Sequence, residues 1–184
     1  MTMKQLIEQY VSTNEQEARD KAQILACIDA FDDVLTRDNT IAHFTCSGMV
    51  LNKARTHVLM IYHNIYDSWG WTGGHADGEA DFLAVAQREV LEETGVHATP
   101  ITDDIVSLDV LNVLGHVKKG VFLSPHLHLN VTYAFEADEA APLTIKEDEN
   151  SGVAWIAIED INDKANEEHM KPIYAKIIAR VQQL

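Results

Sequence analysis

The stretch GGHADGEADFLAVAQREVLEETGV, residues 73–96, decides how the rest of this chain is interpreted. A glycine pair opens it, and a helical pattern then runs to Gly95, a residue type that commonly ends helices. Leu83, Ala86 and Val90 recur at helical spacing and give an apolar stripe that can pack on a sheet. The stretch therefore predicts a helix between a glycine loop and Gly95.

Three glutamates share one face of this helix. Glu89, Glu92 and Glu93 are spaced i, i+3 and i+4, so their carboxylates lie on the same side. Like charges at this spacing repel one another, and the last turn of a helix disfavours anions. Three glutamates alone would indicate a solvated helix face. A bound cation would remove both penalties, and clustered carboxylate oxygens suit Mg²⁺ or Mn²⁺ better than zinc.

The same stretch resembles the motif of the Nudix hydrolases, G-x5-E-x7-R-E-U-x-E-E-x-G-U, in which U is a bulky aliphatic residue. The matching residues are Gly74, Arg88, Glu89, Val90, Glu92, Glu93, Gly95 and Val96. The first glutamate of the motif is replaced by Ala80, which stands between Glu79 and Asp81. In the family this glutamate is generally less critical than those of the R-E-U-x-E-E core, so the departure concerns activity and not the fold.

The resemblance implies an α/β fold, the Nudix-type α/β/α sandwich with a mixed β-sheet, over residues 40–184. Residues 1–39 form an added N-terminal helical extension that the motif does not explain. The implied activity is a metal-dependent pyrophosphohydrolase. It would cleave a phosphoanhydride bond in a nucleoside diphosphate linked to another moiety, or in a related small phosphorylated metabolite, with Mg²⁺ or Mn²⁺ as cofactor.

The resemblance also implies roles for the motif residues. The metal ligands would be Glu89, Glu92, Glu93 and the backbone carbonyl of Gly74. The loop of Gly73 and Gly74 would shape the pyrophosphate site. Arg88 would orient the glutamates by a charged hydrogen bond.

A further carboxylate outside the motif is expected in a loop, as a metal ligand or general base. Glu147 and Glu149 are the candidates for it. The group that takes the proton from the attacking water is Glu92, Glu89 or Glu149, and the sequence does not choose among them.

Residues 121–135 predict a strand with two unlike faces. His126, His128 and Asn130 point to one side with Thr132, while leucine and valine residues alternate with them on the other. Because the apolar face must be buried, the uncharged polar face is predicted to line the substrate cleft. The two histidines could also bind zinc, but no further cysteine or histidine pair in the sequence completes such a site. His75 and His97, which flank the motif helix, are expected to be exposed loop residues.

Periodicity outlines the remaining elements. The N-terminal extension predicts helices over residues 3–11 and 14–36, and it could cover the sheet or contact a second subunit, which leaves a homodimer open. Further predictions are strands at 43–51, 56–62, 104–117 and 153–156, a turn at Lys118–Gly120, and a last helix that has Pro172 in its first turn.

Composition excludes several classes of partner. The net charge of −15 repels nucleic acid polymers and anionic membranes, so a small substrate is expected. No apolar run is long enough for a transmembrane helix, and the N-terminus turns polar too early for a signal peptide. Cys27 and Cys46 have no metal-binding spacing and indicate a reduced, cytoplasmic protein.

Two alternatives to a hydrolase stay open. One is a catalytically impaired Nudix-fold module that binds a ligand or regulates, which Ala80 supports. The other is an isoprenoid-diphosphate isomerase, a relative of the same fold that needs a cysteine in its site. Cys46 is the plausible one.

Overall fold

The computed structural model describes residues 1–118 and 120–184, with only the backbone of Lys118. Its helices are α1 (Met3–Gln9), α2 (Glu15–Ala30), α3 (Phe82–Thr94), α4 (Ile161–Lys164) and α5 (Lys171–Val181), with a 3-10 turn, η1 (Ile158–Asp160). Its strands are β1 (Ala42–Asn52), β2 (His57–His63), β3 (Ser68–Gly70), β4 (Thr72–His75), β5 (Thr99–Pro100), β6 (Ser107–Val113), β7 (His116–Lys118), β8 (Val121–Leu123), β9 (His126–Ala137) and β10 (Asn150–Ala157).

The sheet is mixed, as expected, and β1 lies at its centre. The strands follow the order β10-β2-β1-β9-β5, with β3 paired to β2, β4 to β1 and β6 to β9. β1 runs parallel to β9 along its whole length, and its pairings with β2 and β4 are antiparallel. Parallel pairing of β1 with β9 sets the polar residues of the two strands in register.

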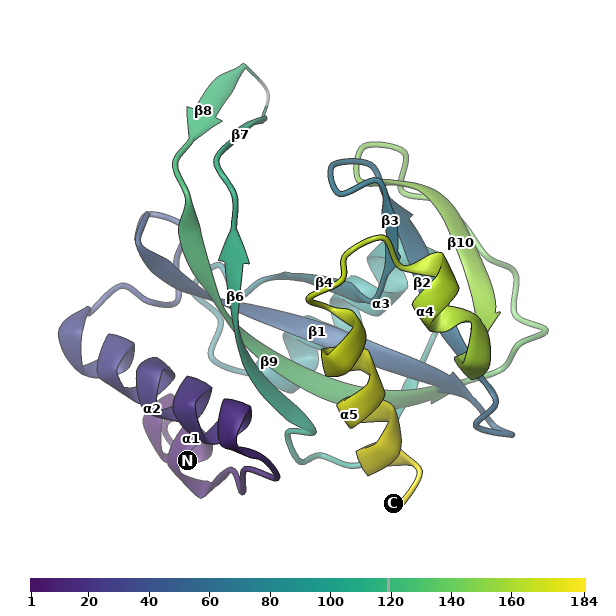
Figure 1. The fold of residues 1–184 in the computed structure, drawn as a ribbon, viewed down its shortest axis with the longest axis horizontal. Coiled ribbons are helices and arrows are strands. Elements are labelled where there is room, and N and C mark those ends of the chain that lie inside the picture. The colour runs from purple at the N-terminus through teal and green to yellow at the C-terminus, as the bar shows by residue number, and fades with distance from the viewer. Residues whose placement is uncertain (119) are drawn as a thin grey trace.

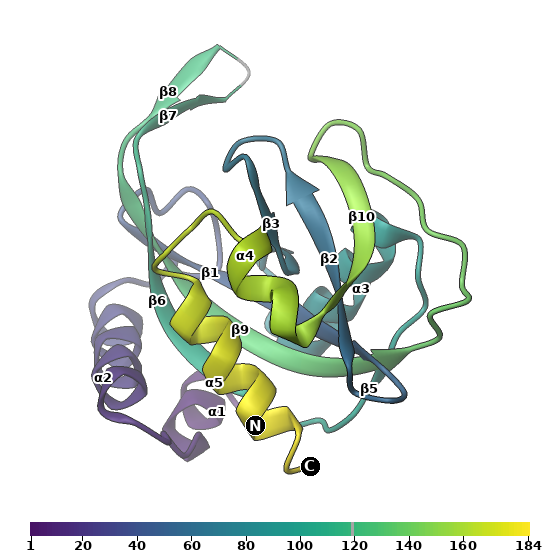
Figure 2. The same cartoon turned by 45° about the vertical axis from the view of Figure 1, so that its right-hand side comes forward.

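Helices cover both faces of this sheet, which confirms the expected α/β/α sandwich (Figures 1 and 2). Every residue of β1 is buried, because its side chains alternate between two cores. Phe44, Cys46 and Val50 pack in the core under α3. Met49 and Leu51 point the other way, into the core under α5.

The N-terminal extension packs on the molecule's own sheet. Ile7 and Ile24 are fully buried in the same core as α3. The buried Glu17 on α2 lies 3.3 Å from Lys176 and 3.8 Å from Arg180, both on α5. Lys176 also contacts Asp109 of β6 at 2.5 Å. Charged groups thus tie the extension to β6 and α5.

Two expected elements have different limits. The helix expected over residues 14–36 ends at Ala30, and Phe31 is extended. The segment after it makes backbone hydrogen bonds of its own, because the carbonyl groups of Val34 and Leu35 accept from Phe44 and Gly78. These long-range contacts replace helical ones and are not visible in the periodicity.

The two long strands expected at 104–117 and 121–135 are each interrupted. β6 and β7 are separated by Leu114 and Gly115, and β8 and β9 by Ser124 and Pro125. Proline has no backbone N–H for the ladder, which explains the second break. β7 and β8 form a separate antiparallel hairpin that projects from the sheet (Figure 1). The turn expected at Lys118–Gly120 lies partly outside the described residues.

Among the described residues, no helix is long and apolar enough to cross a membrane.

Candidate active site

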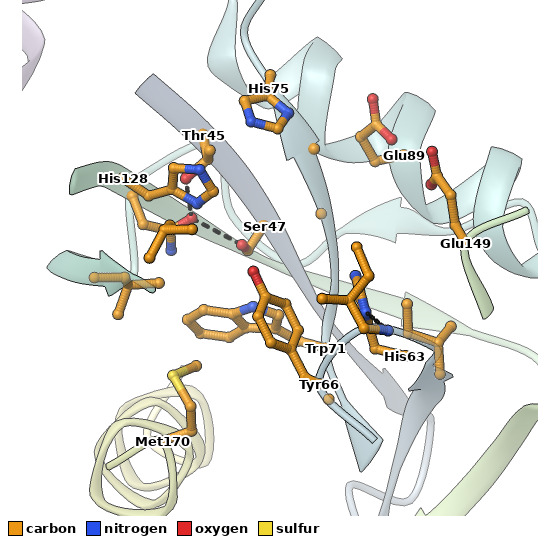
Figure 3. A pocket seen from close by; sticks show the side chains of 18 of the residues that line it. Thr45, Ser47, His63, Tyr66, Trp71, His75, Glu89, His128, Glu149 and Met170 are labelled. Carbon is orange, nitrogen blue, oxygen red and sulfur yellow. Dashed lines mark hydrogen bonds between the residues drawn. The ribbon is translucent and has the colours of Figure 1, made fainter. Parts of the chain in front are cut away.

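A cavity of about 520 Å³ opens on the α5 face of the sheet, beside the helix that carries the glutamates. On this face the alternating residues of β1 and β9 change from apolar to polar near one end. His43, Thr45 and Ser47 of β1 line the cavity, whereas Met49 and Leu51 further along belong to the core. Figure 3 shows Glu89 and Glu149 on one side of the cavity and His128, Thr45 and Ser47 on the other.

The helix α3 presents its glutamates to this cavity. Asp81 caps its N-terminus by accepting a hydrogen bond from the backbone N–H of Ala84, and Gly95 ends it with a φ of 74°. Glu93 is 2% exposed and accepts a hydrogen bond from the backbone N–H of Gly73 at 2.9 Å. Burial raises the pKa of Glu93 to about 8. Burial, followed by the charge of Glu92, raises the pKa of Glu89. Both carboxylates therefore lack enough positive charge around them.

The missing side chain of Gly74 leaves room for the Glu89 carboxylate. A Cβ atom placed on it would lie 2.4 Å from the carboxyl carbon of Glu89, much closer than any real contact. At Gly73 a Cβ atom would lie 2.7 Å from the hydroxyl oxygen of Ser47. The glycine pair lets β4 pass between β1 and the glutamates, and it brings backbone next to the carboxylates.

Glu149 joins the glutamates from a distant part of the chain. Lys146 places its ammonium group 3.1 Å from Glu149 and 3.3 Å from Glu92. Glu149 lines the cavity with Glu89, Glu92 and Glu93, whereas Glu147 does not. Of the two loop carboxylates that the sequence offered, the fold thus brings Glu149 to the site.

Arg88 contacts Glu79 as well as a glutamate of its own helix. Its guanidinium donates a hydrogen bond to Glu79 at 2.7 Å, and its Nε atom lies 3.9 Å from Glu92. Ala80 is exposed. Glu79 thus gives Arg88 a carboxylate partner beside the position where the motif has its first glutamate, while Asp81 caps the helix.

The predicted polar face of β9 does line the cavity, with His126, His128 and Asn130. The amide oxygen of Asn130 accepts hydrogen bonds from the hydroxyl groups of Thr45 and Ser47, each at 2.9 Å, and its nitrogen donates to Thr132. Asn130 therefore links β9 to β1 in the wall of the cavity. Its amide oxygen already accepts two hydrogen bonds, from Thr45 and Ser47.

Histidines from two other strands join this wall. His75 is not an exposed loop residue: it ends β4, is half-buried and lines the cavity. His43 of β1 is 4% exposed. The sequence around His126 and His128 contains no second histidine pair. Strand pairing in the sheet brings His43 and His75 next to them. His97 is exposed, as expected.

Aromatic side chains form another part of the lining. Trp71 packs edge-on against Tyr174 with ring centroids 5.3 Å apart. The ring of Tyr66 is tilted against that of His63, with centroids 4.5 Å apart (Figure 3). The sequence did not single out Trp71, Tyr66, Met170 or Tyr174 as residues of a pocket. The polar alternation in β1 was a signal for Thr45 and Ser47, whereas nothing local marks Met170.

Comparison with known proteins agrees with this fold. The NUDIX domain model matches residues 43–177. A hydrolase of the NUDIX family from Clostridium perfringens has a similar structure, with a TM-score of 0.55 and 18% identity over 77% of this chain and 97% of that one. An Ap4A hydrolase from C. elegans, solved as a binary complex, has a TM-score of 0.57 and 18% identity over 77% and 98%. No curated protein matches the sequence significantly.

Proposed function

Because the chain belongs to the NUDIX family, we propose that it is a metal-dependent pyrophosphohydrolase. Its substrate class would be a nucleoside diphosphate linked to another moiety, or a related small phosphorylated metabolite. The observation that carries this proposal is the group of four carboxylates, Glu89, Glu92, Glu93 and Glu149, around one cavity beside a glycine loop. This arrangement offers cation ligands next to backbone that a phosphate can approach.

The residues fit a hard divalent cation, Mg²⁺ or Mn²⁺. The ligands would be Glu89, Glu92 and Glu93, with the carbonyl of Gly74, and carboxylate and carbonyl oxygens are the donors that these ions prefer. The raised pKa values of Glu89 and Glu93 indicate carboxylates that need positive charge, and the Lys146 ammonium already sits between Glu92 and Glu149. When bound, such a cation would neutralise the pyrophosphate and acidify a water molecule.

The protein's own groups would divide the remaining work. The Gly73–Gly74 loop leaves room for the pyrophosphate. A carboxylate takes the proton of the attacking water, and Glu92, Glu89 and Glu149 are the candidates because all three line the cavity. Arg88 acts from outside the cavity, through its contacts with Glu79 and Glu92.

The wall of His126, His128 and Asn130, with the aromatic surface of Trp71 and Tyr66, is where we place the rest of the substrate. An aromatic face suits a nucleobase, because bases stack on such rings. The fold relative from C. elegans is an Ap4A hydrolase, which makes dinucleoside polyphosphates one class to test.

The alternatives have less support. An isomerase would need the thiol of Cys46, but this residue is fully buried and burial raises the pKa of its thiol. The only sequence feature that favours a binding module without catalysis is Ala80, which replaces the first glutamate of the motif. Glu79, next to Ala80, provides a carboxylate partner for Arg88, which weakens this alternative. A homodimer and a cytoplasmic location stay predictions, as does the absence of a nucleic acid partner.

A substrate screen tests the proposal. Nucleotide sugars, dinucleoside polyphosphates, nucleotide cofactors and nucleoside triphosphates would be incubated with Mg²⁺ or Mn²⁺, and phosphate release measured. We expect hydrolysis of at least one class and at least a hundredfold lower kcat in Glu93→Gln, which removes one ligand charge. Glu15→Gln, an exposed change on α2, is the control. If all classes bind but none is hydrolysed, and Ala80→Glu then creates activity, the chain is a binding module.

A further inference from the structure

Four histidines line the cavity together. His43 comes from β1, His75 from β4, and His126 and His128 from β9. The sheet aligns them, because β1 pairs His43 with His128, and Thr45 with both His75 and Asn130. The ring centroids of His43 lie 5.1 Å from those of His75 and His128 and 4.9 Å from that of His126.

The hydrogen bonds of His43 and His126 fix which nitrogen of each of these two rings carries the proton. The Nδ1 atom of His43 lies 2.8 Å from the carbonyl oxygen of Asn39, and a carbonyl can only accept, so Nδ1 carries the proton. The Nε2 atom of His43 is then a lone-pair acceptor. It is buried and has no hydrogen-bond partner among the described residues. His126 has the same arrangement, with its Nδ1 atom 2.8 Å from the carbonyl oxygen of Ser124.

His128 adds a second buried imidazole whose Nε2 atom has no hydrogen-bond partner in the described part of the chain. Burial lowers the pKa of both His43 and His128 below the ordinary histidine value. A buried acceptor without a donor has lost its hydrogen bond to water and gained none in return, which is unfavourable. Neutral imidazoles whose other nitrogen donates to a backbone carbonyl are the usual form of metal-binding histidines.

We propose that His43, His75 and His128 bind a transition-metal ion of the Zn²⁺ class, at a site distinct from the glutamates. One ligand nitrogen of each ring lies within 4.8 Å of the others. Around a tetrahedral Zn²⁺ with Zn–N bonds of about 2.0–2.1 Å, such nitrogens are about 3.4 Å apart, so small side-chain rotations would close the site. His126 is the candidate fourth ligand, at 5.2 Å between ring centroids from His128.

The donor set separates this site from the carboxylate site. Imidazole nitrogen suits Zn²⁺, Co²⁺, Ni²⁺ or Cu²⁺, whereas carboxylate oxygen suits Mg²⁺ and Mn²⁺. Because His75 follows Gly74 directly on β4, the two sites share one strand and one cavity. A cation held by the histidines would add positive charge where we place the far end of an anionic substrate.

Calorimetry with Zn²⁺ tests the proposal on the intact protein after transition metals have been removed. Saturating Mg²⁺ is present throughout to occupy the carboxylate site. We expect one Zn²⁺ per chain, and at least tenfold weaker binding in His75→Ala and in His128→Ala. His97→Ala, a change at an exposed histidine outside the cluster, should bind Zn²⁺ like the wild type, and so should Glu93→Gln. Equal Zn²⁺ affinity in the wild type, His75→Ala and His128→Ala would overturn the proposal, as would loss of binding in Glu93→Gln alone.

A second measurement needs no variant and therefore does not depend on how the variants fold. Co²⁺ added to the wild type should give the visible absorption bands of a tetrahedral nitrogen-ligated ion, and Zn²⁺ should abolish them. In imidazole ¹⁵N spectra, Zn²⁺ should shift the Nε2 resonances of His43 and His128 and leave those of His97 unchanged. Absence of both the Co²⁺ bands and these shifts would show that the histidines contact substrate or solvent only.

Discussion

Gly74 illustrates how single residues set the geometry of the carboxylate site. A side chain on it would occupy the place of the Glu89 carboxylate, because the two would be 2.4 Å apart. The missing side chain, and not an unusual backbone angle, is what this position requires, since the φ of Gly74 is not in the left-handed region. Its role is therefore to let β4 lie against the glutamate side chain.

Gly74→Ala should displace Glu89 and lower kcat at least tenfold, equivalent to about 1.4 kcal/mol of transition-state stabilisation. Steady-state kinetics on the substrate identified in the screen would measure it. The double variant with Glu89→Gln provides the control, because it should be no slower than Glu89→Gln alone. Additive losses would mean that Gly74 acts through another group.

The two cysteines should differ sharply in reactivity. Burial raises the pKa of both thiols, but Cys46 is fully buried, whereas Cys27 is half-buried on α2. A thiol reagent at pH 8 should modify one cysteine in the folded protein and two after unfolding, because thiolate and access are both needed. Cys27→Ser should abolish labelling of the folded protein. Rapid labelling of Cys46 in that variant would reopen the isomerase alternative.

At the scale of elements, the helix α2 is held by charge as well as by apolar packing. Glu17 is 1% exposed and lies between Thr13 and the cations of α5, and its carboxylate accepts from the backbone N–H of Thr13 at 2.8 Å. Lys176 bridges Glu17 and the fully buried Asp109 of β6. Removing one member would leave buried charges without their partner, which costs more than loss of an exposed ion pair.

Glu17→Ala should therefore lower the free energy of unfolding by about 3 kcal/mol. Urea denaturation followed by circular dichroism would measure this change. Glu15→Ala, which removes an exposed ion pair with Arg19 on the same helix, should have little effect and serves as the matched control. If both variants lose the same stability, helix content and not the buried charge network explains the result.

At the scale of the whole molecule, the extension and the sheet share one core. Residues 1–39 supply Ile7, Tyr10 and Ile24 to the cluster that also holds α3. Residue 40 is where the part of the chain with the family resemblance was expected to begin. The residues before and after it contribute to one hydrophobic core.

A chain of residues 40–184 should accordingly lose cooperative folding or melt at least 10 °C lower than the full chain, because this part of the core and the Asp109 network would be exposed. Differential scanning calorimetry compares the two directly. An unchanged melting temperature would show that the extension is an independent appendage.

What the sequence by itself determined is local. The motif helix, the glycine pair before it and the alternation of β9 follow from spacing within about twenty residues, and the structure contains each of them. Helical and strand periodicity place Glu89, Glu92 and Glu93 on one face, and His126 and His128 on another, before any tertiary contact is known.

Only the tertiary structure decided which distant residues join these groups. Glu149 reaches the glutamates through a loop 56 positions after Glu93, and His43 meets His128 because β1 and β9 pair in parallel. Strand pairing and loop closure depend on long-range packing, which leaves no periodic mark on the sequence. For the same reason the partner of Arg88 and the histidine cluster emerged only from the fold.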